Sequence, residues 1–479
     1  MNTFDLTPWE RKNALDVLIS ILEKYYSGES VTRVSPPLNI SEIRASVESA
    51  DFSQPVSAAN AVIRITEALE SYIVHLGHPM YYGLFNPRPN FPSILADIIS
   101  AFYNPQLAAW SHSPWASEVE NYLIRLIGEK IGFPAQDTDG VFATGGAEAN
   151  ITAVQCALNH FFPDYGEKGA LALSRRPLIY CSAEAHHSVI RAAKVSGLGR
   201  ESVRPVPVNQ RLEMDIAALE DMLRKDISGS YLPFMVIGTA GTTGTGAIDD
   251  LTSVADIAEK YNLWFHTDSA WGGAALLVPE MKPLLKGIEK SDSVTLDIHK
   301  WLSVTMSASM FITRHPDILG RTFRITTEYM PREAGKLDVV DPFSHSIQWS
   351  RRFTGLKLYL SLMVFGWKGY EEMIVNMTAA GVRLKKLLEQ NNWEILNNTP
   401  LPLACFTDPG LKSDSEFIPW LSSAVVASGK AWVSVYPVRG INTIRACITN
   451  YNTSEENLEA LVKTAGEFRS DYRDPGSIN

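Results

Sequence analysis

Apolar and polar residues follow three different patterns along the chain. Residues 1–80 place apolar side chains at helical spacing, and the TPWE stretch from Thr7 has the form of a capping box with proline in the first turn. The same spacing predicts a helix that Ser113 caps and Pro114 opens. Further helices are predicted over residues 57–76 and 91–102. We therefore expect residues 1–80 to form a helical segment of their own.

Residues 81–365 alternate short β-rich runs with helical ones. The β-rich runs are GVFAT, PLIYCSA, SVRPVPV, FMVIGTA and LWFHTD. This alternation predicts a central, mainly parallel sheet with helices on both faces. Ligands bind beyond the carboxyl ends of such strands, so the residues that follow each run are the candidates for chemistry.

Residues 366–479 mix helical and β patterns and predict a small α+β domain at the C-terminus. The helical stretch MIVNMTAAGVRLKKLLEQ is followed by the β-rich stretches AWVSVYPV and NTIRACIT and by a final helix, SEENLEALVKTAGEF. A large domain over 81–365 beside a small domain over 366–479 would enclose a cleft.

Composition narrows the class of protein. The 479 residues exceed the size of a single core, and 45% hydrophobic with 20% charged residues is typical of a soluble globular chain. The net charge of -10 argues against nucleic acid, and no apolar run is long enough for a membrane span. The N-terminus lacks a signal sequence, and the four cysteines have no CxxC spacing. We expect a cytoplasmic protein without a metal site.

Several strand-end residues are suited to chemistry. Gly146 and Ala147 open a helix whose free N–H groups suit one phosphate, although a tight turn alone would also favour glycine. The lysine of a P-loop and the third glycine of a dinucleotide fingerprint are missing, which disfavours ATP and NAD. Asp268 ends an apolar strand, where a carboxylate needs a cationic partner, and Lys300 follows 32 residues later.

A lysine for a Schiff base, a carboxylate for a ring nitrogen, an imidazole plate and a phosphate cup together favour pyridoxal phosphate. The ordered motifs TGGAEAN, AEAHHSV, GTTGTG, HTDSAWGG and DIHKW closely resemble the group II pyridoxal phosphate-dependent amino acid decarboxylases. That family includes the aromatic-L-amino-acid, tyrosine, glutamate and diaminobutyrate decarboxylases. The resemblance implies fold type I, as in aspartate aminotransferase. It also implies a homodimer with the active site at the subunit interface, residues 1–80 serving dimerisation.

The resemblance assigns roles residue by residue. Lys300 would carry the cofactor, Asp268 would pair with the pyridine nitrogen and His186 would stack on the ring. The remaining cofactor contacts it assigns are Ala270, Thr242, Gly146, Ala147 and His299. His187 matches no family role and is expected at the surface or as a cap.

The reaction depends on which Cα bond stands perpendicular to the ring. The resemblance implies loss of the α-carboxylate as CO2, leaving an amine. An aminotransferase would share the fold, and Arg445 in NTIRACIT could be taken for its carboxylate-binding arginine. We interpret Arg445 as a strand residue, because charged residues are usual at strand edges. A regulator that binds the cofactor without catalysis is disfavoured because Lys300, Asp268 and His186 are all present.

Departures from the aromatic branch of the family concern the substrate pocket. Leu84 and Pro87 stand where those enzymes carry tyrosine and threonine, and Ala108 replaces an aromatic residue. Phe85 is kept, so an aromatic or other apolar side chain is favoured, with a larger aliphatic one also allowed. Asp297 replaces a frequent asparagine, which leaves its polar contact open.

The segment AGKLDVVDPFSHSIQWSRRF reads as an exposed loop that closes over the cofactor. In the resembling decarboxylases a tyrosine of this loop is thought to protonate Cα. Members with phenylalanine there let oxygen react, which yields aldehyde, ammonia and peroxide. Counting back from the motif RRF places this position at Pro342, with Phe343 adjacent and His345 the nearest proton donor. We expect a decarboxylase with some oxygen-dependent aldehyde formation.

Overall fold

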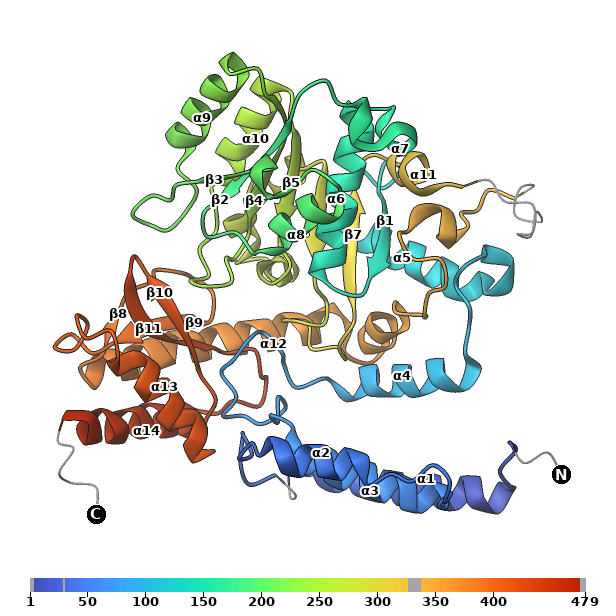
Figure 1. Cartoon of the computed structure of the whole chain (residues 1–479), viewed down its shortest axis with the longest axis vertical. Coiled ribbons are helices and arrows are strands. Elements are labelled where there is room, and N and C mark those ends of the chain that lie inside the picture. The colour runs from blue at the N-terminus through green and yellow to red at the C-terminus, as the bar shows by residue number, and fades with distance from the viewer. Residues whose placement is uncertain (1–3, 29–30, 326–336, 474–479) are drawn as a thin grey trace.

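The computed structural model describes residues 4–28, 31–325 and 337–473 of the chain. A large domain surrounds the central sheet, a smaller domain lies beside it, and a layer of N-terminal helices extends along one side of both (Figure 1).

The central sheet has seven strands in the order β1-β7-β6-β5-β4-β2-β3. Strands β2 to β6 pair in parallel, and β7 runs antiparallel to both β1 and β6. The prediction of a mainly parallel sheet is confirmed. The strands are β1 (Asp139–Ala143), β2 (Pro177–Ser182), β3 (Val203–Val206), β4 (Leu232–Thr239), β5 (Trp264–Asp268), β6 (Ser293–Leu296) and β7 (Ser309–Thr313).

Helices cover both faces of this sheet, as predicted. The core of one face includes α6 (Gly146–Phe161), α8 (Ser188–Val195) and α11 (Ile318–Phe323). The other face packs on α5 (Pro114–Ile131), α9 (Ile216–Ser228) and α10 (Leu251–Tyr261). A short helix, α7 (Tyr165–Lys168), follows α6. Pro114 opens α5 as expected, but the Ser113 side chain makes no capping hydrogen bond, so that part of the prediction is wrong.

The small domain packs helices against a four-stranded antiparallel sheet of order β10-β11-β9-β8. Its long helix α12 (Leu356–Gln390) kinks at Gly366, whose φ of 62° lies in the left-handed region that glycine adopts without strain. This kink coincides with the change of sequence pattern near residue 365. The other elements are β8 (Glu394–Ile395), β9 (Leu403–Thr407), α13 (Phe417–Ser428), β10 (Ser434–Val438), β11 (Ile441–Cys447) and α14 (Glu455–Arg473).

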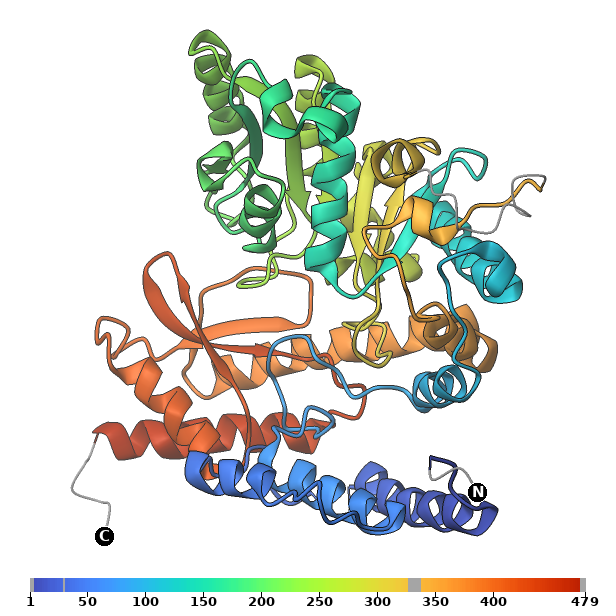
Figure 2. The same ribbon diagram turned by 45° about the vertical axis from the view of Figure 1, so that its right-hand side comes forward.

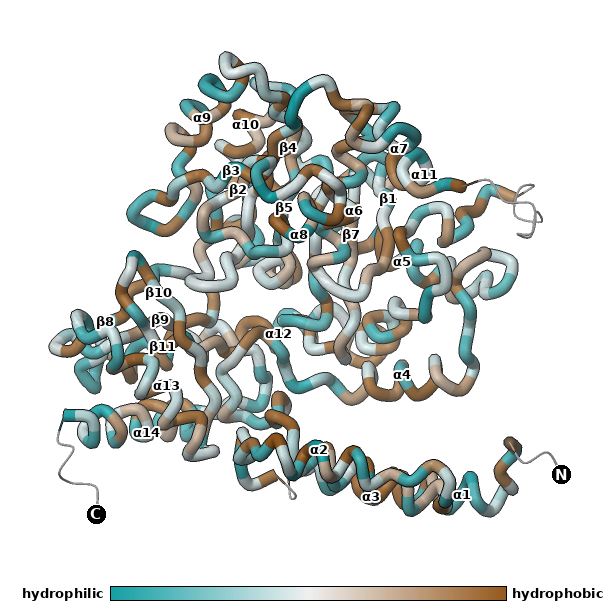
Figure 3. Tube along the Cα trace, viewed as in Figure 1, coloured by the Kyte–Doolittle hydropathy of each residue, from teal (hydrophilic) through white to brown (hydrophobic). Residues whose placement is uncertain are grey.

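The N-terminal helices form a layer with little internal core. Helices α1 (Pro8–Ser27), α2 (Ile40–Glu48) and α3 (Ala58–Tyr72) lie together along one side of the molecule (Figures 1 and 2), where Tyr26 of α1 contacts Phe91. The predicted capping box at Thr7 is confirmed. Neither α1 nor α2 has a buried residue, and apolar positions recur along the layer and along α4 (Phe91–Tyr103) (Figure 3). Among the described residues no helix is both long and apolar enough to cross a bilayer.

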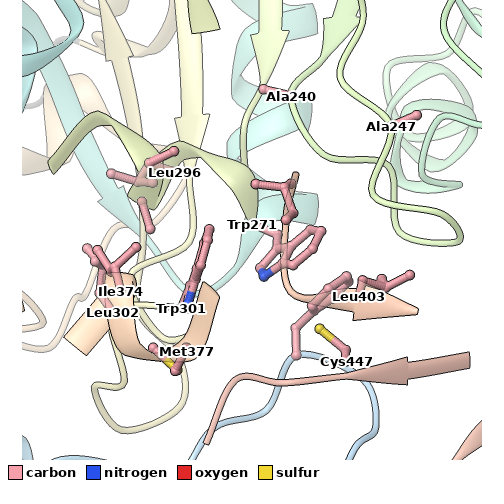
Figure 4. Close-up of a cluster of buried hydrophobic side chains, with 14 of the residues drawn as sticks. Ala240, Ala247, Trp271, Leu296, Trp301, Leu302, Ile374, Met377, Leu403 and Cys447 are labelled. Atoms are coloured by element: carbon pink, nitrogen blue, oxygen red, sulfur yellow. The ribbon is translucent and has the colours of Figure 1, made fainter. Parts of the chain in front are cut away.

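One apolar cluster joins the two domains behind the carboxyl ends of the strands. Trp271 and Trp301 are buried with ring centroids 5.7 Å apart, and each lies close to a candidate site residue in sequence (Figure 4). Ile374 and Met377 of α12 and Leu403 of the small sheet belong to the same cluster. Close packing of this kind resists displacement, so the cluster fixes the floor of the interdomain region.

Candidate active site

Lys300 lies at the carboxyl end of β6, in the turn that follows the strand. Its Nζ is 2.9 Å from Oδ2 of Asp297, and its side chain is 23% exposed. The residues that follow Lys300 are tied to α12, because Nζ of Lys357 donates to the carbonyl oxygen of Met306 at 2.6 Å. The amine is therefore accessible from one side and held by a structured turn.

The first turn of α6 is where the sequence predicts a phosphate cup. The amides of Gly146 and Ala147 have no acceptor among the described residues, as expected for the first turn of a helix. A Cβ atom on Gly146 would lie 2.9 Å from Oδ2 of Asp297, so a larger residue would crowd this point. His299 lies on the other side of the cup, 3.8 Å from where Gly145 would carry a Cβ. Two unpaired amides at a helix start suit a phosphate group.

Asp268 is held by a buried chain of hydrogen bonds. Its Oδ2 accepts from Nδ2 of Asn150 at 2.9 Å, and Oδ1 accepts from the backbone amide of Ala270 at 3.1 Å. Asn150 Oδ1 lies 3.1 Å from Nε2 of His266, whose Nδ1 lies 2.8 Å from the hydroxyl of Ser293. Burial lowers the pKa of His266 to about 4, so the ring is neutral near pH 7.

The neighbours of the neutral His266 ring determine which groups donate and which accept in this series of hydrogen bonds. Trp264 Nε1 donates to Ser293 Oγ at 2.8 Å, and Nδ1 of His266 lies 2.8 Å from the same oxygen. Because Nδ2 of Asn150 donates to Asp268, Oδ1 of Asn150 is left as the acceptor that faces Nε2 of His266. The carboxylate is thereby fixed at the strand end.

His186 lies in the turn between β2 and α8, where its Nδ1 accepts from the backbone amide of Ser188 at 3.2 Å. The Ser188 hydroxyl accepts from Nδ2 of Asn150 at 2.8 Å, which ties this turn to Asp268. Desolvation by the surrounding groups lowers the pKa of His186, which favours the neutral imidazole. The side chains of His186 and His187 are both exposed in this turn.

The remaining predicted cofactor contacts lie around this group. The carbonyl of Ala270 accepts from the backbone amide of Asp297 at 3.0 Å, so the two strand ends are joined. Thr242 is buried, and its hydroxyl contacts that of Thr245 at 2.9 Å. Nδ1 of His299 lies 2.7 Å from the carbonyl oxygen of Ala308.

Phe85 forms an apolar wall beside Lys300. Its ring centroid lies 5.7 Å from Nζ of Lys300 and 4.4 Å from the Trp271 ring. The residue has a φ of 63°, a conformation that is strained for phenylalanine and that recurs at binding sites. Leu84, the neighbouring candidate, is 53% exposed.

Arg445 covers the other side of the Phe85 ring at 4.6 Å. It lies on β11, which confirms our interpretation of it as a strand residue, although the strand is an interior one and the residue is buried instead of lying at a sheet edge. Its Nε donates to the carbonyl of Thr243 and its Nη1 to that of Gly83. Nη2 has no partner among the described residues.

The small domain also holds the GTTGTG loop of the large domain. Four consecutive carbonyls of this loop, Thr243 to Gly246, accept hydrogen bonds from small-domain side chains, namely Arg445, Cys405, Asn397 and Thr399. Tyr436 donates to Oε2 of Glu184 at 2.6 Å, two residues before His186. These bonds fix the small domain against the wall that carries Thr242.

Three residues that the sequence predicts for the site, Ala108, Phe343 and His345, belong to another part of the fold. Phe343 donates its backbone N–H to the carbonyl of Ala108 at 3.0 Å, and His345 Nε2 lies 3.5 Å from Oδ2 of Asp139. Asp139 begins β1, whereas the cup follows the end of this strand, so about 15 Å of strand separates His345 from the cup. Residues 342 and 344–346 are buried, so the expectation of an exposed loop is wrong there. The start of that segment, residues 334–336, lies outside the described residues.

The sequence reasoning missed Asn150 and His266. Asn150 closes the quoted motif TGGAEAN one turn into α6, and His266 lies in the strand LWFHTD. A polar residue on a helix face otherwise lined by buried alanines is a signal that a partner is required. Which partner it meets depends on the packing of α6 against β5.

The donor set fits pyridoxal phosphate. Gly146 and Ala147 offer free amides for the phosphate, Lys300 an amine for the aldehyde carbon, and Asp268 a fixed carboxylate for a protonated ring nitrogen. One group fits less well, because the Asp297 carboxylate lies between the lysine and the cup.

Comparison with known proteins agrees with this chemistry. Aromatic-L-amino-acid decarboxylase of Bacillus atrophaeus is 29% identical over 402 residues, which are 82% of this chain and 81% of the relative. Acidic amino acid decarboxylase of Bos taurus is 28% identical over 407 residues, 82% of this chain and 78% of the relative. The crystal structure of Rhodiola rosea 4-hydroxyphenylacetaldehyde synthase has a TM-score of 0.86 at 23% identity and covers 98% of this chain and 99% of its own.

The last likeness shows the fold, which is fold type I, as the resemblance implied. The profile described as the pyridoxal-dependent decarboxylase conserved domain matches residues 46–408. This match spans the central sheet, Lys300, Asp268 and the first part of the small domain. The chain therefore belongs to the pyridoxal-dependent decarboxylase family, and it is a carboxy-lyase that uses pyridoxal phosphate.

Proposed function

We propose that this decarboxylase removes the α-carboxylate of an L-amino acid with an aromatic or other apolar side chain, and that it works as a homodimer. The observation that carries the substrate class is the Phe85 ring, which lies 5.7 Å from Nζ of Lys300 and is stacked on Trp271. A flat apolar wall beside the reacting amine favours substrates that bury apolar surface there.

Lys300, Asp268 and His186 each have a separate role in the proposed reaction. Pyridoxal phosphate bound here supplies an electron-poor ring that takes up the electron pair left on Cα when CO2 departs. Lys300 would provide the amine that holds the cofactor. Asp268, oriented by Asn150, would stabilise a proton on the ring nitrogen, and His186 would lie against the face of the ring.

A substrate with an acidic side chain is the alternative within the same reaction. It is favoured by Nη2 of Arg445, a buried donor without a partner among the described residues, on the far side of Phe85. A distal carboxylate that reached it would satisfy this donor. An α-carboxylate held there would instead be stabilised before its loss, which opposes decarboxylation.

A panel of L-amino acids distinguishes the two substrate classes. Phenylalanine, tyrosine, tryptophan, leucine, glutamate and aspartate are incubated with the holoenzyme while CO2 and amine are measured. We expect the highest kcat/KM with an apolar side chain and a larger loss in Phe85→Ala than in Arg445→Met. Turnover confined to glutamate or aspartate and abolished by Arg445→Met would contradict the apolar assignment.

The homodimer is supported by apolar side chains that one chain leaves exposed. Trp9, Phe102 and Tyr103 are 73%, 72% and 83% exposed. A groove of about 1260 Å³ between α1, α4 and residues 73–79 has a mainly apolar lining and reaches His299. Continuous apolar surface of this kind is covered in stable proteins, and a second copy here would lie against the cofactor site. Light scattering of the holoenzyme should give twice the chain mass.

We also propose a cytoplasmic location. All four cysteines are buried and unpaired, which suits a reducing compartment. Fractionation of the native host with an antibody against this chain would test the assignment.

A second outcome for the same substrate is oxidative, giving aldehyde, ammonia and peroxide. It is favoured by the stretch from residue 337 to residue 353, which contains phenylalanine at 343 but no tyrosine. Because the turn that carries Phe343 and His345 packs at the start of β1 in its own chain, this outcome requires the turn to reach the site of the second copy. Peroxide formed per CO2 is measured in the parent, Phe343→Tyr and His345→Ala. Amine alone in all three would leave simple decarboxylation.

A further inference from the structure

Asp297 occupies an unusual place for a carboxylate. It follows β6 directly, is 3% exposed, and places Oδ2 2.9 Å from Nζ of Lys300. The hydroxyl of Ser309 donates to Oδ1 at 2.5 Å, so the orientation of the carboxylate is fixed by the neighbouring strand. The reacting amine thus has a built-in counterion three residues away in sequence.

The same carboxylate borders the phosphate cup. A Cβ atom on Gly146 would lie 2.9 Å from Oδ2 and 3.0 Å from Oδ1, and Nε2 of His299 lies 4.0 Å from Oδ2. Burial alone would raise the pKa of Asp297, but the Lys300 ammonium, His299 and the Ser309 hydroxyl together hold that pKa below its ordinary value. Asp297 is therefore charged at neutral pH.

We propose that Asp297 competes with the cofactor for Lys300. Its carboxylate pairs with the amine of Lys300, and this pairing lowers the affinity of the chain for pyridoxal phosphate and slows the loading of the enzyme. The proposal rests on the assignment of Lys300 as the lysine that bonds the cofactor.

The linkage step shows why the ion pair opposes loading. The Lys300 ammonium must first release one proton to solvent, and its nitrogen then bonds to the aldehyde carbon of the cofactor. The aldehyde oxygen leaves as water with the two hydrogens that remained on the nitrogen. The carboxylate at 2.9 Å pairs with this nitrogen, and that contact must be given up before the nitrogen reaches the aldehyde carbon. Asparagine would accept from Ser309 in the same way without the negative charge.

Asp297→Asn tests this in cofactor-free protein. Pyridoxal phosphate, or pyridoxal without its phosphate, is titrated into parent and variant while the visible absorbance of the linked cofactor is followed. We expect the Kd of both compounds to fall about 10-fold or more in the variant, since one partly shielded ion pair is removed. Association of pyridoxal phosphate, followed by stopped flow, should also accelerate.

Asp292→Asn is the matched control, because it removes a carboxylate that also pairs with basic side chains and lies at the other end of β6, where its side chain is 15% exposed against 2% for that of Asp297. Asp292 pairs with Arg314 and His315, away from Lys300, so both affinities should equal those of the parent. If Asp297→Asn does not fold, as judged by circular dichroism, Asp297→Ser replaces it in the same titrations.

Three outcomes would overturn the proposal. Unchanged or weaker binding of both compounds would mean that Asp297 does not compete. Tighter binding of pyridoxal phosphate alone would mean that the carboxylate acts on the phosphate and not on Lys300. Equal gains in Asp292→Asn would point to a general charge effect. Borohydride reduction and peptide mapping of the same samples separate these results from a failure of the proposed function, in which Lys300 would carry no label.

Discussion

Replacing Asn150 with leucine removes the hydrogen bond that orients the Asp268 carboxylate but leaves the charge of that carboxylate in place. Leucine has nearly the same size and no hydrogen-bonding group, so Asp268 loses the donor that lies 2.9 Å from its Oδ2. His266 loses its acceptor at 3.1 Å at the same time. The carboxylate keeps its charge but loses the group that orients it.

The expected loss follows from the hydrogen bond that is removed. A hydrogen bond to a charged group contributes about 1.5–3 kcal/mol. If the ring proton depends on this orientation in the transition state, kcat should fall about 10- to 150-fold. The KM for substrate should change little, because Asn150 is buried behind Asp268. Bound cofactor, measured by absorbance, should remain at more than half of the parent amount, roughly within 1 kcal/mol of the parent affinity.

The matched control is Asn159→Leu on the same helix. Asn159 is half-buried, and its Nδ2 donates to the carbonyl of Gln155 at 2.9 Å, nine residues beyond Asn150 and about 13 Å along α6. Its kcat should equal that of the parent. A cofactor-loaded Asn150→Leu enzyme with parental kcat would refute the reasoning, as would an equal loss of kcat in both variants.

Three further predictions follow from the same structure. Borohydride reduction of the holoenzyme followed by peptide mapping should place the cofactor on Lys300, and a label on another lysine would contradict the site. Asp268→Ala should lose far more turnover than cofactor, because the charge acts on the electron pair at Cα; equal kcat in variant and parent would be the opposite result. Burial raises the pKa of Asp249 from 3.8 to about 6, so the folded chain binds this proton more tightly than the unfolded chain. Its contribution to the free energy of unfolding should therefore decline as pH rises from about 4 to 6, and cofactor-free Asp249→Asn should show a flatter dependence of the urea midpoint on pH over that range.

Much of the fold and part of the site follow from local sequence. Alternating β-rich and helical runs are sufficient for a mainly parallel sheet, because each run has only one way to bury its apolar face. Carboxyl ends of parallel strands meet at one edge, so Asp268, His186 and the glycines before α6 converge there without knowledge of their contacts. The cap at Thr7 is local as well, since its hydrogen bonds span three residues.

Tertiary structure decided which side chains meet. Asn150 and Asp268 are 118 residues apart in sequence, and no local period encodes the packing of α6 on β5 that joins them. The same holds for Arg445, which the central strand of the small sheet buries against Phe85. The polar residues in 342–346 predict an exposed loop. The turn is buried because His345 pairs with Asp139 and the backbone amide of Phe343 donates to the carbonyl of Ala108.

Asp297 shows the limit most clearly. Its identity is plain in the sequence, but its effect depends on distances to Lys300 and Gly146 that only the folded chain sets. Spacing in sequence determines backbone geometry and the faces that side chains share, whereas the energy of a buried charge is determined by every group that packs around it.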